Sequence, residues 1–329
     1  EEEMSYEEAV AGARERLITS VGLRLRADVP MAFCMSGGVD SNALISIAKN
    51  VYGYDVHGFT IIVPDERYNE KELVDYSVEQ LGIKHSSITA NPDLFLPRLK
   101  ELVRQHDAPV HTINYFAHWL LMESISEQGY RISVSGTGAD ELFTGYYDHH
   151  LAYLNDIKGS PTLHENAKKA WARHVRPIVR NPFLRDPDLF INSPNFRDHI
   201  FLDSKQFSSC MKNNWKEDFE EYNFSDSLLR NRMLNEMFVE TVPPILHEDD
   251  LNAMYYSIEN RAPYLDKGLF EFCYSIPTRH LMGDAFTKIV LRDSVSGIVP
   301  GKILSTRQKI GFNAPISSFL DVENAQVKS

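Results

Sequence analysis

Cysteine is scarce in this chain of 329 residues, and the three cysteines lie far apart, at Cys34, Cys210 and Cys273. An odd number at these spacings indicates neither a metal-binding pair nor a disulfide framework. The sequence also lacks any run of about 18 to 20 uncharged apolar residues, the length that a membrane span needs. Its first residues, which begin with three glutamates, show no feature of a secretory signal. We therefore expect a cytoplasmic protein with reduced cysteines and no membrane partner.

Positive charge is in deficit, because 34 Lys and Arg residues face 46 Asp and Glu residues and leave a net charge of −12. An acidic surface repels phosphate backbones, so we expect no nucleic-acid partner. Apolar residues make up 43% and charged residues 24%, which is typical of a globular protein. The length suffices for one large domain or two smaller ones.

Short apolar runs alternate with helical patterns in the first part of the chain, which predicts a parallel twisted sheet with helices on both faces. We expect strands at 29–35, 56–63, 85–88 and 131–135, and helices at 6–25, 42–51, 70–81, 93–105 and 114–128. Beyond about residue 145 strand-like runs are absent, and helices are expected at 164–176, 215–240, 245–258 and 266–275. We therefore divide this α/β protein into a layer over residues 1–150 and a mainly helical part over 151–329.

A glycine loop, Ser36-Gly37-Gly38-Val-Asp40-Ser41, stands between a predicted strand and a predicted helix. Ligands bind at this edge of a parallel sheet, and the glycines let backbone N–H groups approach an anion closely. Asp40 would repel a phosphate unless a cation such as Mg²⁺ lay between them. A tight turn without a ligand is the alternative. The loop is not a Walker motif; it resembles the loop of enzymes that cleave ATP to AMP and pyrophosphate.

A second glycine loop, Ser135-Gly-Thr-Gly-Ala-Asp140-Glu, follows the predicted strand at 131–135. Taken alone, an acidic turn after a strand is typical of a helix N-terminus. As a second loop at a second strand end, it is expected to place Asp140 opposite Asp40 across one Mg-pyrophosphate group.

With both loops in place, the chain resembles the asparagine synthetase family, specifically its C-terminal synthetase domain, which is an ATP-pyrophosphatase of the adenine nucleotide alpha-hydrolase-like fold. Further segments agree with the family in order, at 246–254, 257–266, 287–292 and 307–312. The resemblance covers nearly the whole chain, from about residue 6 to 320. Relatives that close β-lactam rings share this domain, so the resemblance indicates adenylation more firmly than it indicates a substrate.

The resemblance implies a role for each matching residue. The residues that would hold ATP are Cys34, Ser36, Gly37, Gly38, Asp40, Ser41, Ile61, Ser135 and Gly136. Asp40 and Asp140 would bind Mg²⁺. The first residues, 1–150, would then form the nucleotide-binding layer, and the helical part would complete the acceptor site.

Charged residues near the C-terminal end have further implied roles. Lys309 matches a lysine that stabilises negative charge as the adenylate forms and collapses. Lys288 is a weaker candidate that is expected to pair with a carboxylate, and Glu259 and Arg261 are expected to form a structural ion pair. The histidines lack metal-binding spacing, so we expect core or surface positions for them.

Thr137 departs from the family pattern. Asparagine synthetases have Glu at this position and the β-lactam-forming relatives have Tyr, and the side chain moves protons from the attacking amine. Threonine has no useful acid or base near neutral pH. We keep Thr137 as a catalytic candidate beside Lys309, and expect either that another group takes over this work or that the acceptor is not aspartate.

The glutaminase domain that precedes the synthetase domain in full-length family members does not match any part of this chain. We expect a truncated part of a longer protein; a separate glutaminase subunit or free ammonia are the alternatives, and a homodimer is a further possible assembly.

Three functions stay open at this point. The first is ATP-dependent conversion of aspartate to asparagine with ammonia from glutamine. The second is amidation of another carboxylate, such as a uronic-acid sugar of a surface polysaccharide. The third is a nucleotide-binding regulator without catalysis, against which the intact charged residues argue. Modification of tRNA conflicts with the acidic charge and the lack of a basic stripe.

Overall fold

The computed structural model describes residues 4–62, 70–89, 91–201, 204–213, 217, 219–307, 316, 319 and 320. A five-stranded sheet in the order β3-β2-β1-β4-β5 organises the chain, and every neighbouring pair is parallel. The strands are β1 (Met31–Cys34), β2 (His57–Ile62), β3 (Lys84–Thr89), β4 (Ile132–Val134) and β5 (Glu259–Arg261). The four strands that the sequence predicts are confirmed, as is the parallel sheet.

The fifth strand, β5, is not predicted by the sequence, and the expectation that strands end before residue 145 is wrong here. Its residues, Glu259-Asn260-Arg261, offer neither an apolar run nor an alternation of polar and apolar side chains. The strand forms at the edge of the sheet because β4 presents unpaired backbone groups, and Ile132 pairs in register with Glu259.

Helices cover both faces of the sheet, as the sequence predicts. Met31 and Phe33 of β1 pack into a core with α1 (Tyr6–Arg24), α2 (Val39–Ser46) and α3 (Lys71–Leu81). Ala32 between them faces a second core with α5 (Ile113–Glu127) and α12 (Val242–Tyr255). Alternate side chains of one buried strand therefore serve two layers, which explains its unbroken apolar sequence.

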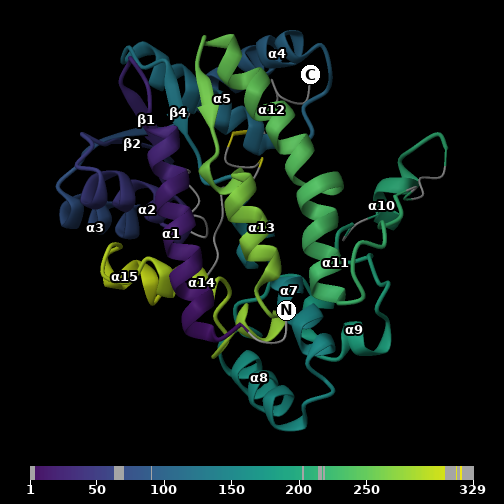
Figure 1. Ribbon diagram of the computed structural model, residues 1–329. Helices are drawn as coiled ribbons and strands as arrows, with labels where there is room; N and C mark the ends of the chain where they lie inside the picture. Colours follow the sequence, from purple (N-terminus) through teal and green to yellow (C-terminus); the bar gives the residue numbers. More distant parts are fainter. Residues whose placement is uncertain are drawn as a thin grey trace.

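The remaining elements are mostly short helices. They are π-helical η1 (Ile47–Val51), which extends α2, α4 (Phe95–His106), α6 (Ala139–Phe143), α7 (Tyr147–Asp156), α8 (Pro161–His174), α9 (Leu189–Asn192), α10 (Ser204–Ser209), α11 (Leu228–Asn235) with its π-helical extension η5 (Glu236–Glu240), α13 (Lys267–Ser275), α14 (Ile289–Ser294) and α15 (Gly301–Leu304). Single 3₁₀ turns are η3 (Pro92–Leu94), η4 (Phe183–Arg185), η6 (Pro263–Leu265) and η7 (Thr278–His280). In Figure 1, α7, α8 and α9 lie at the end of the molecule opposite α4 and α5.

The helix expected at 215–240 is shorter in the structure, because α11 begins only at Leu228. The Ser227 side chain caps this helix by accepting the Arg230 N–H. Just before it, the Asn235 side chain bonds both backbone groups of Tyr222, which holds that stretch in a non-helical conformation.

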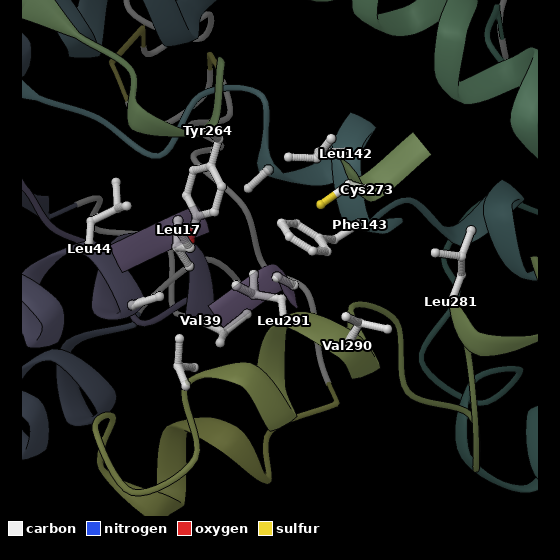
Figure 2. Packing of buried hydrophobic residues seen from close by; sticks show 14 of the residues in the cluster. Leu17, Val39, Leu44, Leu142, Phe143, Tyr264, Cys273, Leu281, Val290 and Leu291 are labelled. Atoms are coloured by element: carbon white, nitrogen blue, oxygen red, sulfur yellow. The ribbon is translucent and has the colours of Figure 1, made fainter. Parts of the chain in front are cut away.

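The main core joins segments from both ends of the chain. Figure 2 shows Leu17 of α1, Phe143 of α6 and Leu291 of α14 around the ring of Tyr264. Tyr264 is fully buried, and its hydroxyl donates to the carbonyl oxygen of Asp40 at 3.0 Å. This hydrogen bond fixes the first glycine loop to the main core. The division of the chain at residue 150 stays a prediction.

Among the described residues, none of the helices is at once long and apolar enough to cross a bilayer.

Arg261 of β5 forms hydrogen bonds to the backbone at and just after the end of α1. Its guanidinium donates to the carbonyls of Arg24, at 2.7 Å, and Arg26, at 2.9 Å, while its partner Glu259 is largely exposed. Arg261→Met should lower the free energy of unfolding by about 2–3 kcal/mol, because two helix-end carbonyls lose a charged donor. Glu259→Gln should change it by less than about 0.5 kcal/mol. Urea denaturation measures both, and equal effects would contradict the assignment.

Candidate active site

A cleft of about 1060 Å³ opens at the carboxyl ends of β1, β2 and β4. Its lining falls into three groups, which we name by their origin. The sheet wall contains Cys34, Thr60 and Ile61 of β1 and β2 together with Tyr115 and His118 of α5, which packs on the sheet; the basic wall contains Thr287, Lys288, Arg292 and Arg307; the helical wall contains Tyr146, Asp148, His199, Arg232, Glu236 and Glu240. Both glycine loops lie in the same cleft. Sequence segments far apart in the chain therefore form one site.

The first glycine loop is held in shape by its own polar groups. The Asn42 amide donates to the carbonyls of Ser36, at 2.9 Å, and Gly38, at 2.7 Å, and the Ser36 N–H donates to Ser41 Oγ at 3.1 Å. Gly38 caps α2 without a side-chain bond to the helix N-terminus, so the first N–H groups stay available to an anion. The sequence does not single out Asn42, because its role depends on hydrogen bonds within the folded loop.

At two glycines of the loops, an added Cβ would crowd a neighbouring segment. A Cβ on Gly37 would lie 3.0 Å from Leu73 Cβ, and one on Gly136 would lie 3.3 Å from Asp40 Cβ. The second contact means that the two loops touch each other directly. The Gly37 N–H donates to a carboxylate oxygen of Glu70 at 3.2 Å, which shows that this loop can present an N–H to an anionic oxygen.

Asp40 and Asp140 converge on one cation, and that cation is the ammonium group of Lys288. Lys288 Nζ lies 2.7 and 2.6 Å from the two carboxylate oxygens of Asp40 and 2.6 Å from Asp140 Oδ1. Burial lowers the pKa of Lys288, but the two carboxylates outweigh this and raise it, so the amine stays protonated. The predicted meeting of the two aspartates is thus observed, and Lys288 pairs with both.

The backbone around this ion pair is unusual. Lys288 has a φ of +57° and precedes α14, and its N–H donates to Thr144 Oγ1 at 3.1 Å. Thr144 itself has a φ of +70° and is fully buried. Left-handed conformations are costly for residues with a Cβ and persist where the surroundings impose them. The structure therefore fixes the backbone from which the Lys288 side chain extends.

Thr137 lies beside a buried acid that the sequence analysis missed. Its hydroxyl donates to Asp249 Oδ2 at 3.5 Å, and Asp249 Oδ1 lies 3.4 Å from Nδ1 of His118. Burial raises the pKa of Asp249, and the opposing effects of His118 and Thr137 are smaller. All three line the cleft. Asp249 belongs to the 246–254 segment, so a signal existed, but no residue spacing connects it with Thr137.

A buried cluster in the helical wall, Asp148, His149 and Glu236, has the composition of a metal site. The hydrogen bonds argue otherwise. His149 Nδ1 accepts the Gly145 N–H at 3.1 Å, so Nε2 carries the proton and donates to Glu236 at 2.8 Å. A metal would need the electron pair that this proton occupies. Burial also raises the pKa of Glu236 to about 7, as expected for a carboxyl group in a dry network.

The asparagine synthase family matches residues 12–326, which is most of the chain. The chain belongs to this family. Among curated relatives it is 26% identical over 332 residues to the glutamine-hydrolyzing asparagine synthetase 1 of Bacillus subtilis (strain 168), covering 95% of this chain and 51% of the relative. It is 22% identical over 350 residues to the amidase chry2 of Gibberella zeae, covering 93% and 52%. The chain spans about half the length of these relatives.

One solved structure, the U34-tRNA thiolase NcsA from Methanococcus maripaludis with its [4Fe-4S] cluster, is similar with a TM-score of 0.34 and 14% identity. The match covers 76% of this chain and 78% of that one. A likeness of this strength carries no argument about function.

The residues that family membership singles out lie together in the cleft wherever the structure describes them. Cys34, Ile61, Ser135 and Gly136 all line the cleft, and the first loop and both aspartates do so too. Lys309 lies outside the described residues. Whether each performs its implied role remains a proposal.

Gly145 has no Cβ and thereby leaves the space that the Asp140 carboxylate occupies. A Cβ on Gly145 would lie only 1.6 Å from Asp140 Oδ1, so Gly145→Ala should push the carboxylate away from Lys288. We expect the free energy of unfolding to fall by about 1–3 kcal/mol. Gly159→Ala is the matched control, because a Cβ there meets nothing within 4 Å. Chemical denaturation of both variants tests this, and an unchanged Gly145→Ala protein would disprove the close packing.

Proposed function

We propose that this chain activates a carboxylate with ATP, releases pyrophosphate, and lets ammonia convert the acyl-adenylate to an amide and AMP. The observation that carries the proposal is the meeting of the two glycine loops in one cleft, with Asp40 and Asp140 directed at a common cation. Adenylation needs backbone N–H groups and cations placed around a triphosphate, where they stabilise the charge that develops as pyrophosphate leaves. The membership in the asparagine synthase family supports it.

Different residues of the cleft would bind different parts of MgATP. The N–H groups of the first loop and the hydroxyls of Ser36 and Ser41 would bind phosphate oxygens. The basic wall would receive the leaving pyrophosphate; there the Arg292 guanidinium is oriented by its bonds to the carbonyls of Thr287, at 3.0 Å, and Leu304, at 2.8 Å. Mg²⁺ fits the two aspartates, which already share one cation, and when bound it would neutralise charge on the phosphates.

The amide-forming step needs a proton acceptor. Nitrogen attacks the acyl carbon, the bond to the AMP oxygen breaks, and the nitrogen gives up a proton. Thr137 cannot keep that proton, but Asp249 lies next to it and His118 lies behind Asp249. We assign Asp249 as the base, because burial raises its pKa towards the range where a carboxylate accepts a proton effectively. Lys309 keeps its proposed role in stabilising the adenylate.

Aspartate is the first candidate acceptor, with ammonia from glutamine supplied by a glutaminase domain or subunit. A specific observation favours a second candidate, a uronic-acid sugar. The charged groups of the helical wall are paired already: Asp148 with His199, Arg232 with Glu221, Glu236 with His149, and Glu240 with Arg197. A free amino acid would have to compete with these pairs for its own charges, whereas hydroxyl groups can bond to the paired side chains without breaking them.

The products of ATP cleavage test the proposal. The protein is incubated with ATP, Mg²⁺, ammonium and either aspartate or a uronic-acid sugar, and AMP, ADP and the amide are quantified by mass spectrometry. We expect AMP in a 1:1 ratio with one amide, and at least about a hundredfold less with Asp40→Ala. Asp55→Asn, a change of a largely exposed residue, is the control and should leave the rate unchanged. ADP in place of AMP would refute the adenylation chemistry.

The two half-reactions separate the role of Asp249. Asp249→Asn should retain exchange of labelled pyrophosphate into ATP, which reports adenylation, and lose about a hundredfold or more of amide formation. Asp226→Asn changes an exposed residue and should affect neither half-reaction. Equal loss of both half-reactions in Asp249→Asn would mean that this acid supports the site but does not accept the proton.

A further inference from the structure

The ammonium of Lys288 occupies the point at which a divalent cation would bind. It lies within 2.7 Å of three carboxylate oxygens from Asp40 and Asp140, and Lys288 is only 4% exposed. Mg²⁺ binds carboxylate oxygens at about 2.0–2.1 Å and therefore needs the same space. The ammonium and the metal ion cannot both lie between these oxygens. One of them has to leave when the other arrives.

Electrostatics decides when this exchange is favourable. Without nucleotide, Lys288 already offsets half of the charge of the two carboxylates, and adding a divalent ion beside it would leave an excess of one positive charge. Two like charges a few ångströms apart repel each other strongly at the effective dielectric constant of a protein surface, and a divalent ion doubles that repulsion. The phosphates of a bound nucleotide reverse the balance, because they supply the negative charge that a second cation requires.

When displaced, the Lys288 ammonium would stay within the cleft, next to the other residues of the basic wall. Lys288 follows Thr287 and directly precedes the helix that carries Arg292, and Thr287 and Arg292 both line the same basic wall of the cleft. A lysine carries its charge on four flexible methylene groups, so the ammonium can move while the backbone stays fixed. The left-handed backbone at Lys288 and its bond to Thr144 keep the root of the side chain in position throughout.

We propose that Lys288 is a resident counter-ion that keeps divalent metal out of the two-aspartate site until nucleotide binds, and then transfers to the phosphates. This inference rests on the proposed function for the identity of the ligand, but not on turnover. The metal would then enter together with the nucleotide, and between reaction cycles Lys288 would keep the charge of the two aspartates partly neutralised. Lys288 acts as a positioning residue for the metal and contacts the pyrophosphate portion once displaced.

Binding of Mn²⁺ to the protein without nucleotide tests the exchange. Free Mn²⁺ is measured by electron paramagnetic resonance during titration. The unchanged protein should bind Mn²⁺ weakly alone and at least about tenfold more tightly with a non-hydrolysable ATP analogue. Lys288→Met should bind Mn²⁺ at least about tenfold more tightly than the unchanged protein when nucleotide is absent. Adding Asp40→Asn to Lys288→Met should abolish the gain, and Lys302→Met, which removes a lysine paired with Glu72 outside the cleft, should behave like the unchanged protein.

Thermal unfolding gives a second readout that does not depend on activity. Lys288→Met leaves two carboxylates without their cation, so its melting temperature should fall in chelator and recover with Mn²⁺, whereas the unchanged protein should respond little to Mn²⁺. If Lys288→Met does not fold, Lys288→Gln takes its place with the same expectations. Tight nucleotide-independent Mn²⁺ binding by the unchanged protein would overturn the proposal. Failure of the AMP assay would overturn the proposed function instead, because neither metal-binding readout requires an acceptor.

Discussion

The ion pair of one lysine with two aspartates is the constraint on which the site depends. Asp40 and Asp140 follow β1 and β4, which lie side by side, with Phe33 in register with Val134. The chain builds the sheet outward from β1 to β3 and then returns to place β4 on the other side of β1. Parallel sheets bind ligands at such a reversal, because the loops there diverge and leave a crevice. The sheet order therefore brings two acidic loops within reach of a single cation.

Much of this arrangement could be predicted because it is local. Alternating apolar runs and glycine loops depend on neighbouring residues, so four strands, most of the helices and the approximate place of the cleft followed from the sequence. The edge strand β5 could not be predicted, since only pairing with β4 makes its polar residues extended. The same holds for Asp249 of α12 and His118 of α5, because only packing places Asp249 beside Thr137 and His118 beside Asp249.

The helical wall shows how a cleft can be rich in charge without being strongly charged. Arg197 alone bonds Glu217, Glu221 and Glu240, and Glu221 also holds the buried Arg232. Pairs of this kind contribute little to stability once desolvation is counted, but they hold side chains in fixed orientations. A rigid, charge-compensated surface of donors and acceptors is suited to recognise the shape and hydroxyl pattern of an acceptor. On the other side of the cleft, the cations Lys288, Arg292 and Arg307 of the basic wall lie near the acidic residues of the two glycine loops.

The late position of β5 has a consequence for synthesis of the protein on the ribosome. Residues 259–261 complete a sheet whose other strands are all made by residue 134, and the main core needs α13 and α14 against α1. During translation the edge of β4 stays unpaired, and the apolar face of α1 stays uncovered by α13 and α14, until more than a hundred residues beyond β4 have been synthesised. Exposed strand edges and apolar faces are where nascent chains aggregate or recruit chaperones. The fold that brings the two aspartates together thus becomes complete only after the residues of α14 have emerged from the ribosome.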